Sequence, residues 1–475
     1  MNARSTALRK LVSVLNTASV NFLVAKKSNM ALFGTDGVRG VANVDLTAEL
    51  AVDLAVAAAH VLGEIGLFAG HRPKAIVGQD SRASGDFLES AIIAGLTSAG
   101  VDVYRVGVLP TPAVAYLVTE SNEDLGVMIS ASHNPMPDNG IKFFAKGGDK
   151  LADSLELQIE NRLGEPWSRP TGLDVGRIYH DESANQRYID YLLSTISIDL
   201  NGLKVVVDCA NGAASTVAPS AYKKAGASVL AISAAPTGWN INENCGSTHL
   251  NNLISEVKKA GADVGIAHDG DADRCILVAK NGEVIDGDDI LNILSRSYLA
   301  ESKLNKNTVV GTVMSNLGFI ESMESIGIKV EKTAVGDRSV LEKMLDNDYI
   351  LGGEQSGHII MRQFSNSGDG LLTALQIMQV MARSKKSLLE LSSSMTKYPQ
   401  ILINVTDVAK EKLASSAKIK EAVISAEKQL SGVGRVLLRA SGTESLVRVM
   451  VEANDLELAK KVADSLVQLV RLELK

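Results

Sequence analysis

The amino-acid sequence predicts an α/β protein, with three related mixed α/β domains in series and a smaller C-terminal α+β domain. Three observations support this fold class: a length of 475 residues, a composition that is 45% hydrophobic but only 4% aromatic, and a strand–loop–helix–strand pattern that occurs three times. A domain usually holds roughly 100 to 200 residues, so this length corresponds to three or four domains. The aliphatic composition argues against a disordered or fibrous chain.

Each repeat begins with a short β-branched strand, continues through a polar loop and an amphipathic run of helical length, and ends at a glycine that opens a second strand. The three repeats cover residues 75–103, 204–229 and 308–330. A glycine after the helix supplies a left-handed cap, and a right-handed crossover then brings the second strand parallel to the first. The pattern therefore predicts three α/β domains in series.

The chain after Pro399 departs from this pattern and is expected to form an α+β domain of its own. The expected elements are a strand, a helix-like run, two strands and a final helix, over residues 401–405, 410–430, 434–438, 447–452 and 456–472. Boundaries placed where the pattern changes give domains over residues 30–196, 197–286, 287–397 and 398–475.

Residues 1–29 are interpreted as a leader that precedes the folded chain. This segment contains five basic residues and no acidic residue, and its weak apolar run is interrupted by Asn16 and Asn21. We expect a disordered leader or an overextended start, with the functional chain beginning near Met30. An organellar transit peptide is the alternative, because such peptides are also basic, contain serine and lack acidic residues.

Charge and composition exclude several kinds of partner. The formal net charge of −7 gives no general attraction for a polyanion, and no local basic stripe is found, so no nucleic-acid partner is expected. No apolar stretch reaches the roughly 18 to 20 residues that cross a bilayer, so no membrane partner is expected. Cys209, Cys245 and Cys275 lack the spacing of a zinc site or a disulfide framework, which fits the cytoplasm.

The most specific segment runs from Ser130 to Pro135 and places Ser132 directly after an apolar strand. Reacting groups in α/β folds lie at such strand ends. A Ser/His/Asp hydrolase is disfavoured, because consecutive side chains in extended backbone point apart and His133 would then face away from the Ser132 hydroxyl. For this segment alone, an ordinary turn with hydrogen-bonding hydroxyls is the alternative.

Three acidic residues, Asp269, Asp271 and Asp273, alternate with glycine and alanine after another strand-like run. In extended backbone, residues two positions apart face the same way, so the three carboxylates are expected to converge. Three like charges this close repel one another unless a cation lies among them, and hard oxygen ligands indicate Mg²⁺. Arg274 follows directly and suits a phosphate that shares the metal. A solvated acidic turn is the alternative.

Two loops of the third domain carry groups suited to sugar hydroxyls. The run from Gly352 to His358 combines glycines, which let backbone approach a ligand, with Glu354 and Ser356, which offer an acceptor and a donor. A shorter loop after a strand contains Gly336 and Asp337. Taken alone, each loop is interpreted equally well as an ordinary turn.

A candidate anion site lies in the C-terminal domain, where the run from Arg439 to Glu444 is followed by Arg448. Hydroxyls and backbone amides around a glycine form a nest for an anion, and two arginines reinforce it, so this loop is expected to hold a phosphate that does not react. A capped turn with incidental basic residues is the alternative. Near the start of the folded chain, Arg39 lies in a glycine-rich run. It is expected either to bind the reacting phosphate or only to shape a turn.

These four loops, in this order, make the chain resemble the α-D-phosphohexomutase superfamily from Ala31 to Leu474, and the combination is highly specific. Further motifs favour the bacterial amino-sugar branch: residues 33–39, 208–212 and 244–248, and Gln355 where phosphomannomutase/phosphoglucomutase enzymes tend to carry Met. Two features depart from the family pattern: the leader, and Ser445 where the family usually has Pro.

The resemblance implies a heart-shaped arrangement of four domains around a central cleft, to which each domain contributes one loop. Ser132 would carry the phosphoryl group as phosphoserine. One Mg²⁺ would be held by Ser132, Asp269, Asp271 and Asp273.

The resemblance also implies the remaining roles in catalysis. Lys142 and His358 match family positions suited to general acid and base work. Arg39 and Arg274 match positions that steady the reacting phosphate. The residues expected to hold the sugar and its second phosphate are Arg274, Gly336, Asp337, Glu354, Ser356, Arg439, Ser441, Gly442, Thr443 and Arg448.

The implied partner is a small sugar phosphate. Glucosamine 6-phosphate would be converted to glucosamine 1-phosphate through glucosamine 1,6-bisphosphate, and the product would supply UDP-N-acetylglucosamine synthesis. Such an enzyme is an isomerase, and a homodimer is compatible with this interpretation.

Three other functions are weighed against this one. A phosphomannomutase or phosphoglucomutase would use the same mechanism on another sugar. A metal-dependent sugar phosphatase would carry the phosphoryl group on an acid of the triple-Asp loop and release free phosphate. A sugar-phosphate sensor would bind the ligand without converting it.

Overall fold

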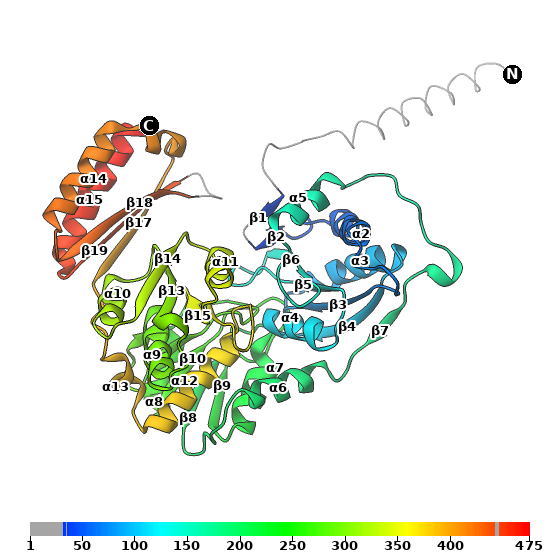
Figure 1. Ribbon diagram of the computed structural model, residues 1–475, viewed down its shortest axis with the longest axis horizontal. Helices are drawn as coiled ribbons and strands as arrows, with labels where there is room; N and C mark the ends of the chain where they lie inside the picture. The colour runs from blue at the N-terminus through cyan, green and yellow to red at the C-terminus, as the bar shows by residue number, and fades with distance from the viewer. Residues whose placement is uncertain (1–31, 35, 442–445) are drawn as a thin grey trace.

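The computed structural model describes residues 32–34, 36–441 and 446–475, and these residues form four β-sheets in sequence order (Figure 1). The expected leader at residues 1–29, and Gly442, Thr443 and Ser445 of the expected phosphate loop, lie outside the described residues. Among the described residues, no helix is long and apolar enough to cross a membrane.

The first unit contains a seven-stranded sheet in the order β1-β2-β6-β5-β3-β4-β7. Its strands are β1 (Phe33–Gly34), β2 (Gly37–Val41), β3 (Lys74–Gln79), β4 (Asp102–Val108), β5 (Leu125–Ile129), β6 (Asp138–Ala145) and β7 (Ile178–His180). Its helices are α2 (Ala48–Glu64), α3 (Gly85–Ser98), α4 (Thr111–Glu120) and α5 (Asp153–Asn161), with the short η1 (Gly172–Asp174). Alternation along β3 sends Val77 into the core under α2 and α3 and Ile76 into the core that contains α4.

The second unit contains a five-stranded sheet in the order β12-β11-β10-β8-β9. Its strands are β8 (Lys204–Asp208), β9 (Ser228–Ile232), β10 (Val264–Ala267), β11 (Ile276–Ala279) and β12 (Val284–Ile285). Its helices are α7 (Ala214–Lys224) and α8 (Asn251–Ala260), and α6 (Ala184–Ser194) leads into it. Val206 packs with the buried face of α8, whereas Val205 and Val207 face the opposite core with α7.

The third unit contains a four-stranded sheet in the order β14-β13-β15-β16. Its strands are β13 (Thr308–Thr312), β14 (Lys329–Thr333), β15 (Leu351–Gly353) and β16 (Ile359–Met361). Its helices are α9 (Gly287–Ala300), α10 (Leu317–Glu324), α11 (Asp337–Asn347), α12 (Gly370–Ser384) and α13 (Leu388–Ser392), with the short η2 (Asn305–Asn307). One apolar core runs through the first three units and joins α4, α7, α9 and α12.

All three units share one strand topology, and this explains the repeats in the sequence. In each unit the first repeat strand pairs in parallel with the second and with a third, and the third pairs with an antiparallel strand. The predicted left-handed caps are present, because Gly100, Gly226 and Gly327 have φ of 91°, 104° and 76°. The predicted fold class is confirmed.

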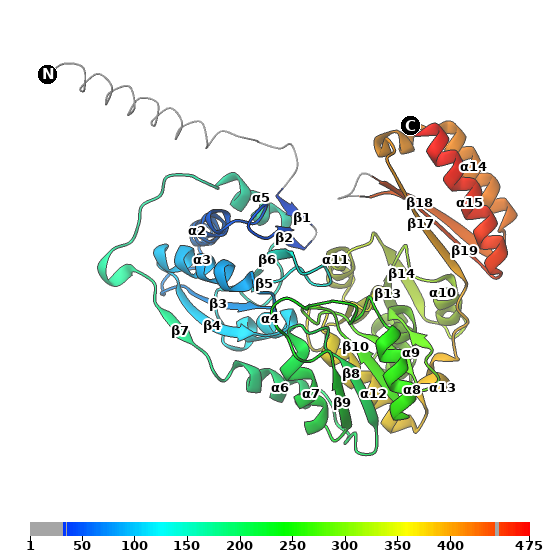
Figure 2. The same cartoon turned by 180° about the vertical axis from the view of Figure 1, so that it is seen from behind.

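The C-terminal unit contains an antiparallel sheet in the order β17-β19-β18 with its own core. Its elements are β17 (Gln400–Thr406), η3 (Lys410–Ser415), α14 (Ala417–Gln429), β18 (Gly434–Ala440), β19 (Leu446–Ala453) and α15 (Leu456–Glu473). In both views it stands beside the third unit and away from most of the first (Figures 1 and 2). Polar contacts join it to the third unit: Glu452 accepts from Leu317 N–H (3.1 Å), and Arg435 donates to the carbonyl of Val313 (3.1 Å).

Candidate active site

Three of the four predicted loops occupy the same position in their units. Each follows the third parallel strand and precedes its antiparallel neighbour: the serine loop lies between β5 and β6, the triple-Asp loop between β10 and β11, and the sugar loop between β15 and β16. Because the carboxyl ends of parallel strands meet at one edge of a sheet, the shared topology presents one loop from each unit to a common centre.

The serine loop is held by buried polar contacts. Ser132 N–H donates to Ser130 Oγ (2.9 Å), and Ser130 Oγ donates to Asp80 Oδ2 (2.6 Å). The buried guanidinium of Arg82 donates to four carbonyls of the loop, those of Ser132, Asn134, Pro135 and Asp138, at 2.6–2.9 Å. These contacts fix the loop before any ligand binds.

Ser132 itself has φ of 52°, in the left-handed region that non-glycine residues rarely adopt. Its hydroxyl donates to Asp269 Oδ2 at 2.5 Å and lies 3.3 Å from His133 Nδ1. The expectation that His133 faces away from this hydroxyl is therefore wrong, because that argument assumed extended backbone. Burial, and then the charges of Arg274 and Arg39, lower the pKa of His133 to about 4.

The carboxylates of Asp269, Asp271 and Asp273 offer oxygens that all lie within 4.8 Å of one another. They converge for a different reason from the one predicted: the loop is a turn rather than extended backbone, and Ala272 has φ of 58°. Burial, followed by the charges of Asp273 and Asp271, raises the pKa of Asp269 to about 8. Crowded acids of this kind favour a bound cation.

The donor set fits a hard divalent cation. Asp271 Oδ1 and Asp273 Oδ1 are buried and have no hydrogen-bond partner among the described residues. Such oxygens are costly to bury unless something binds them, and carboxylate oxygens are the ligands Mg²⁺ prefers. The second oxygen of Asp271 is already used, because it accepts from Thr111 Oγ1 (2.6 Å) and from Lys142 Nζ (2.8 Å). Thr111, at the start of α4, was not identified from the sequence.

Lys142 belongs to a series of paired acidic and basic side chains that starts and ends in the triple-Asp loop, and we call this series the charge ring. Its members, in order, are Asp271, Lys142, Asp36, Lys150, Asp337, His358 and Asp273. Lys142 Nζ lies 2.8 Å from Asp36 Oδ2, and Lys150 joins Asp36 to Asp337. His358 Nε2 lies 3.8 Å from Asp337 Oδ2. The ring passes through three units and closes on the triple-Asp loop.

His358 closes the charge ring at Asp273, where His358 Nδ1 lies 3.5 Å from Asp273 Oδ2. Gly368 N–H donates to Nε2 (3.2 Å), so the neutral form of His358 carries its proton on Nδ1. Burial lowers the pKa of His358, but the hydrogen bond and charge of Asp273 outweigh burial and raise it to about 8. The side chain can therefore exchange a proton near neutral pH.

The sugar loop carries two polar side chains of the predicted site, Glu354 and Ser356. Glu354 Oε1 accepts from Gly336 N–H (3.0 Å), which joins the two predicted sugar-binding loops. Ser356 Oγ is buried without a hydrogen-bond partner in the part of the chain that the structure describes. A sugar hydroxyl would satisfy it.

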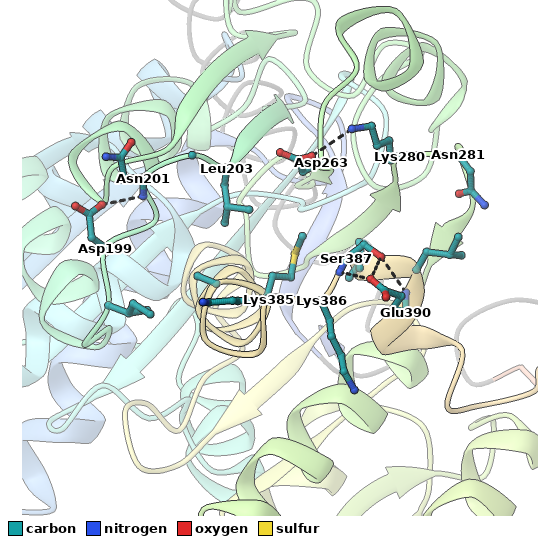
Figure 3. A pocket seen from close by; sticks show the side chains of 16 residues that line it. Asp199, Asn201, Leu203, Asp263, Lys280, Asn281, Lys385, Lys386, Ser387 and Glu390 are labelled. Atoms are coloured by element: carbon teal, nitrogen blue, oxygen red, sulfur yellow. Dashed lines mark hydrogen bonds and ion pairs between the residues drawn. The ribbon is translucent and has the colours of Figure 1, made fainter.

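Some of the predicted site residues line a cavity of about 720 Å³, but Ser132, Lys142, Asp269, Asp271 and Ser356 are not part of its lining. Three units contribute to its lining, which includes Arg39, His133, Asp273, Arg274, Asp337 and His358. A larger hollow of about 880 Å³ lies between the second and third units and contains none of the predicted site residues (Figure 3). In it, Lys280 pairs with Asp263 (3.5 Å).

The described residues of the C-terminal unit do not line the 720 Å³ cavity. Arg439 and Arg448 stand directly opposite each other on β18 and β19, and Lys410 Nζ donates to the carbonyl of Ser441 (2.8 Å). Burial, and then the charge of Arg448, lower the pKa of Arg439, as expected where two cations lie side by side.

Comparison with known proteins identifies the class. Residues 30–167, 186–282 and 286–398 match models of the alpha/beta/alpha domains I, II and III of phosphoglucomutase/phosphomannomutase, and residues 402–469 match the model of its C-terminal domain. The chain belongs to this family of phosphohexomutases, as its motifs predicted.

Within the family, the chain is similar to enzymes named phosphoglucosamine mutase. One from Streptomyces griseus is 58% identical over 93% of this chain and 98% of the relative. One from Acidothermus cellulolyticus is 55% identical over 94% of this chain and 96% of the relative. The predicted amino-sugar branch and isomerase class are thereby confirmed.

Solved structures share the fold at lower identity. A phosphoglucomutase/phosphomannomutase family protein from Burkholderia thailandensis has a TM-score of 0.78 and 22% identity, covering 94% of this chain and 98% of that one. N-acetylphosphoglucosamine mutase from Aspergillus fumigatus, in complex with GlcNAc-6P and magnesium, has a TM-score of 0.67 and 17% identity, covering 95% and 97%.

Proposed function

We propose that the chain interconverts glucosamine 6-phosphate and glucosamine 1-phosphate by way of a phosphoserine at Ser132 and a bound glucosamine 1,6-bisphosphate. One observation carries the proposal: the Ser132 hydroxyl lies 2.5 Å from Asp269 Oδ2, in a loop where two further buried carboxylate oxygens have no hydrogen-bond partner among the described residues. A nucleophile that shares a cation site with three acids is suited to holding and returning a phosphoryl group.

Asp269, Asp271 and Asp273, with Ser132, would hold one Mg²⁺, which when bound neutralises charge on the phosphoryl group. The protein itself aligns the reacting phosphate with the attacking hydroxyl. Arg39 and Arg274 border the cavity where the reacting phosphate would lie and can bind its oxygens in pairs. In the transfer, a sugar hydroxyl oxygen bonds to phosphorus as the bond from phosphorus to Ser132 Oγ breaks. The hydroxyl proton leaves, and Ser132 Oγ gains a proton.

His358 and Lys142 are placed for these proton transfers. Asp273 raises the pKa of His358 to about 8, against the effect of burial, so a fraction of His358 is neutral near pH 7 and can accept the hydroxyl proton. Lys142 is buried between Asp36 and Asp271, so it is charged before the transfer and is assigned the acid role, in which it gives a proton to Ser132 Oγ. Reversal of the two roles serves the return step.

The sugar must be held in two orientations, because each phosphate of the bisphosphate must reach Ser132 in turn. Glu354 and the unpartnered Ser356 Oγ offer an acceptor and a donor that either orientation can use. The second phosphate is assigned to Arg439, Ser441 and Arg448 of the C-terminal unit, which must approach the other units to enclose the substrate. The setting is the cytoplasm, in keeping with three free, buried cysteines.

The decisive experiment is intact-mass measurement of the wild type and Ser132→Ala, with exposed Ser90→Ala as the control. We expect one removable phosphoryl group in the wild type and in Ser90→Ala, none in Ser132→Ala, and parallel loss of glucosamine-phosphate interconversion. Accumulation of free phosphate would instead point to a phosphatase, and full interconversion by Ser132→Ala would exclude Ser132 as the phosphoryl carrier. Faster turnover of glucose or mannose 6-phosphate would reassign the substrate.

A further inference from the structure

Lys150 occupies an unusual position for a lysine outside the known motifs. It follows β6, with only 17% of its side chain exposed, and its ammonium group lies between the carboxylates of Asp36 and Asp337. Lys150 Nζ lies 2.5 Å from Asp337 Oδ2, and it also donates to Asp36 Oδ1. One cation thus compensates two carboxylates that belong to different units.

Each of the two carboxylates leads to active-site groups. Asp36 accepts from Arg39 and lies 2.8 Å from Lys142 Nζ, so it positions two cations near the reacting phosphate. Asp337 begins α11, beside Gly336, whose N–H donates to Glu354 Oε1 (3.0 Å). Lys150 therefore joins the groups around Ser132 to the groups that would hold the sugar.

The boundary between the first and third units around Lys150, which we call the seam, is polar. Asn366 Nδ2 donates to Asp149 Oδ1 (3.0 Å), and Arg338 pairs with Glu156 (3.0 Å). Cavities of about 270 and 440 Å³ border the seam, so apolar packing is incomplete there. Ion pairs and hydrogen bonds, rather than close packing, must set how the first and third units meet at this point.

We propose that Lys150 is a positioning residue for the mutase reaction, which fixes the spacing between Arg39 and Lys142 on one side and the sugar loop on the other. This inference rests on the proposed function. Both sugar orientations must meet Ser132 at the same distance, so this spacing has to be kept through both transfers. A shift of about 1 Å in such a spacing can cost on the order of 10²-fold in rate.

The test compares Lys150→Met, Lys150→Arg and Arg338→Met. Arg338 is the matched control, because it crosses the same seam to Glu156 but touches neither Asp36 nor the Asp337 carboxylate. We expect Lys150→Met to lower kcat on the order of 10²-fold with a smaller change in KM. Lys150→Arg should recover most of the rate. Arg338→Met should lower the melting temperature but keep kcat within about threefold of the wild type.

A double variant, Lys150→Met with Asp337→Asn, separates positioning from stability. Removing one of the two carboxylates that Lys150 pairs with should restore the melting temperature without restoring kcat. Recovery of kcat together with stability, an unchanged kcat in Lys150→Met, or an equal loss in Arg338→Met would each overturn the inference. Failure of the proposed function would be seen separately, as a wild type that does not interconvert glucosamine phosphates or carries no phosphate on Ser132.

Discussion

Lys142 Nζ lies 2.8 Å from Asp271 Oδ2, and both side chains are almost fully buried. This contact joins strand β6 of the first unit to the triple-Asp loop of the second. It uses one oxygen of Asp271 and leaves the other without a partner among the described residues. The lysine thus balances part of the negative charge of the loop and still leaves an oxygen for a cation.

The first prediction is that Lys142→Met lowers kcat by roughly 10² to 10⁴-fold, because both its charge and its proton are lost at the reacting phosphate. Lys146→Met is the control, since Lys146 lies four residues away and pairs only with Asp124 among the described residues (3.3 Å). Steady-state rates in both directions measure the effect. Equal rates for the two variants would remove Lys142 from the mechanism.

The second prediction concerns the cation. Chelation should abolish turnover, and added Mg²⁺ should restore it and raise the melting temperature, since a ligand of the folded state stabilises it. Asp273→Asn should weaken both effects of Mg²⁺, because it removes one of the converging charges. Asp263→Asn, on the surface beside Lys280, should leave both effects intact. A melting temperature that Mg²⁺ does not change in the wild type would argue against a site in this loop.

The third prediction concerns two side chains that support the triple-Asp loop, His268 and Tyr222. His268 Nδ1 donates to the carbonyl of Arg274 (3.0 Å), and Tyr222 OH donates to His268 Nε2 (2.8 Å). Tyr222→Phe should cost about 1 kcal/mol of stability and also raise the Mg²⁺ concentration needed for half-maximal rate. Tyr298→Phe loses a comparable contact, with Gln363 (2.8 Å), far from the loop. Tyr298→Phe should lower stability without changing the Mg²⁺ concentration needed for half-maximal rate. An equal rise in that concentration in both variants would contradict the supporting role of Tyr222.

The fourth prediction concerns pH and Asp369, which caps α12 and accepts from Tyr188 OH (2.8 Å). Burial raises the pKa of Asp369 to about 6, while hydrogen bonds from Leu372 and Tyr188 oppose the rise. Because the folded-state pKa exceeds the unfolded one, the stability it contributes is full below about pH 4 and is lost as pH rises through about 6. Asp369→Asn should flatten the decline in stability between pH 4 and 6 in urea unfolding. Exposed Asp190→Asn should not.

Much of the site was predictable, because its reactive residues lie close together in short runs of sequence. The triple-Asp loop, the serine loop and the sugar loop each place distinctive residues within a few positions, directly after a strand. The geometry inside these runs was not predictable. Ser132 and Ala272 adopt left-handed backbone, with φ of 52° and 58°, which sequence patterns do not reveal for non-glycine residues.

Partners far apart in the sequence were also missed. Lys150 meets residues 114 and 187 positions away, and Thr111 meets Asp271 from 160 positions away. No local pattern distinguishes Lys150 from a surface lysine. Only the shared topology, which brings equivalent strand ends to one centre, places these charges together.

The charge ring has an evolutionary consequence. Its acidic and basic members come from three units, so replacing one member leaves an unmatched charge in a neighbour encoded elsewhere in the gene. Swapping a single unit for that of a distant homologue should yield an inactive chimaera unless the facing residue is changed as well. The three units are therefore expected to have diverged together rather than as interchangeable modules.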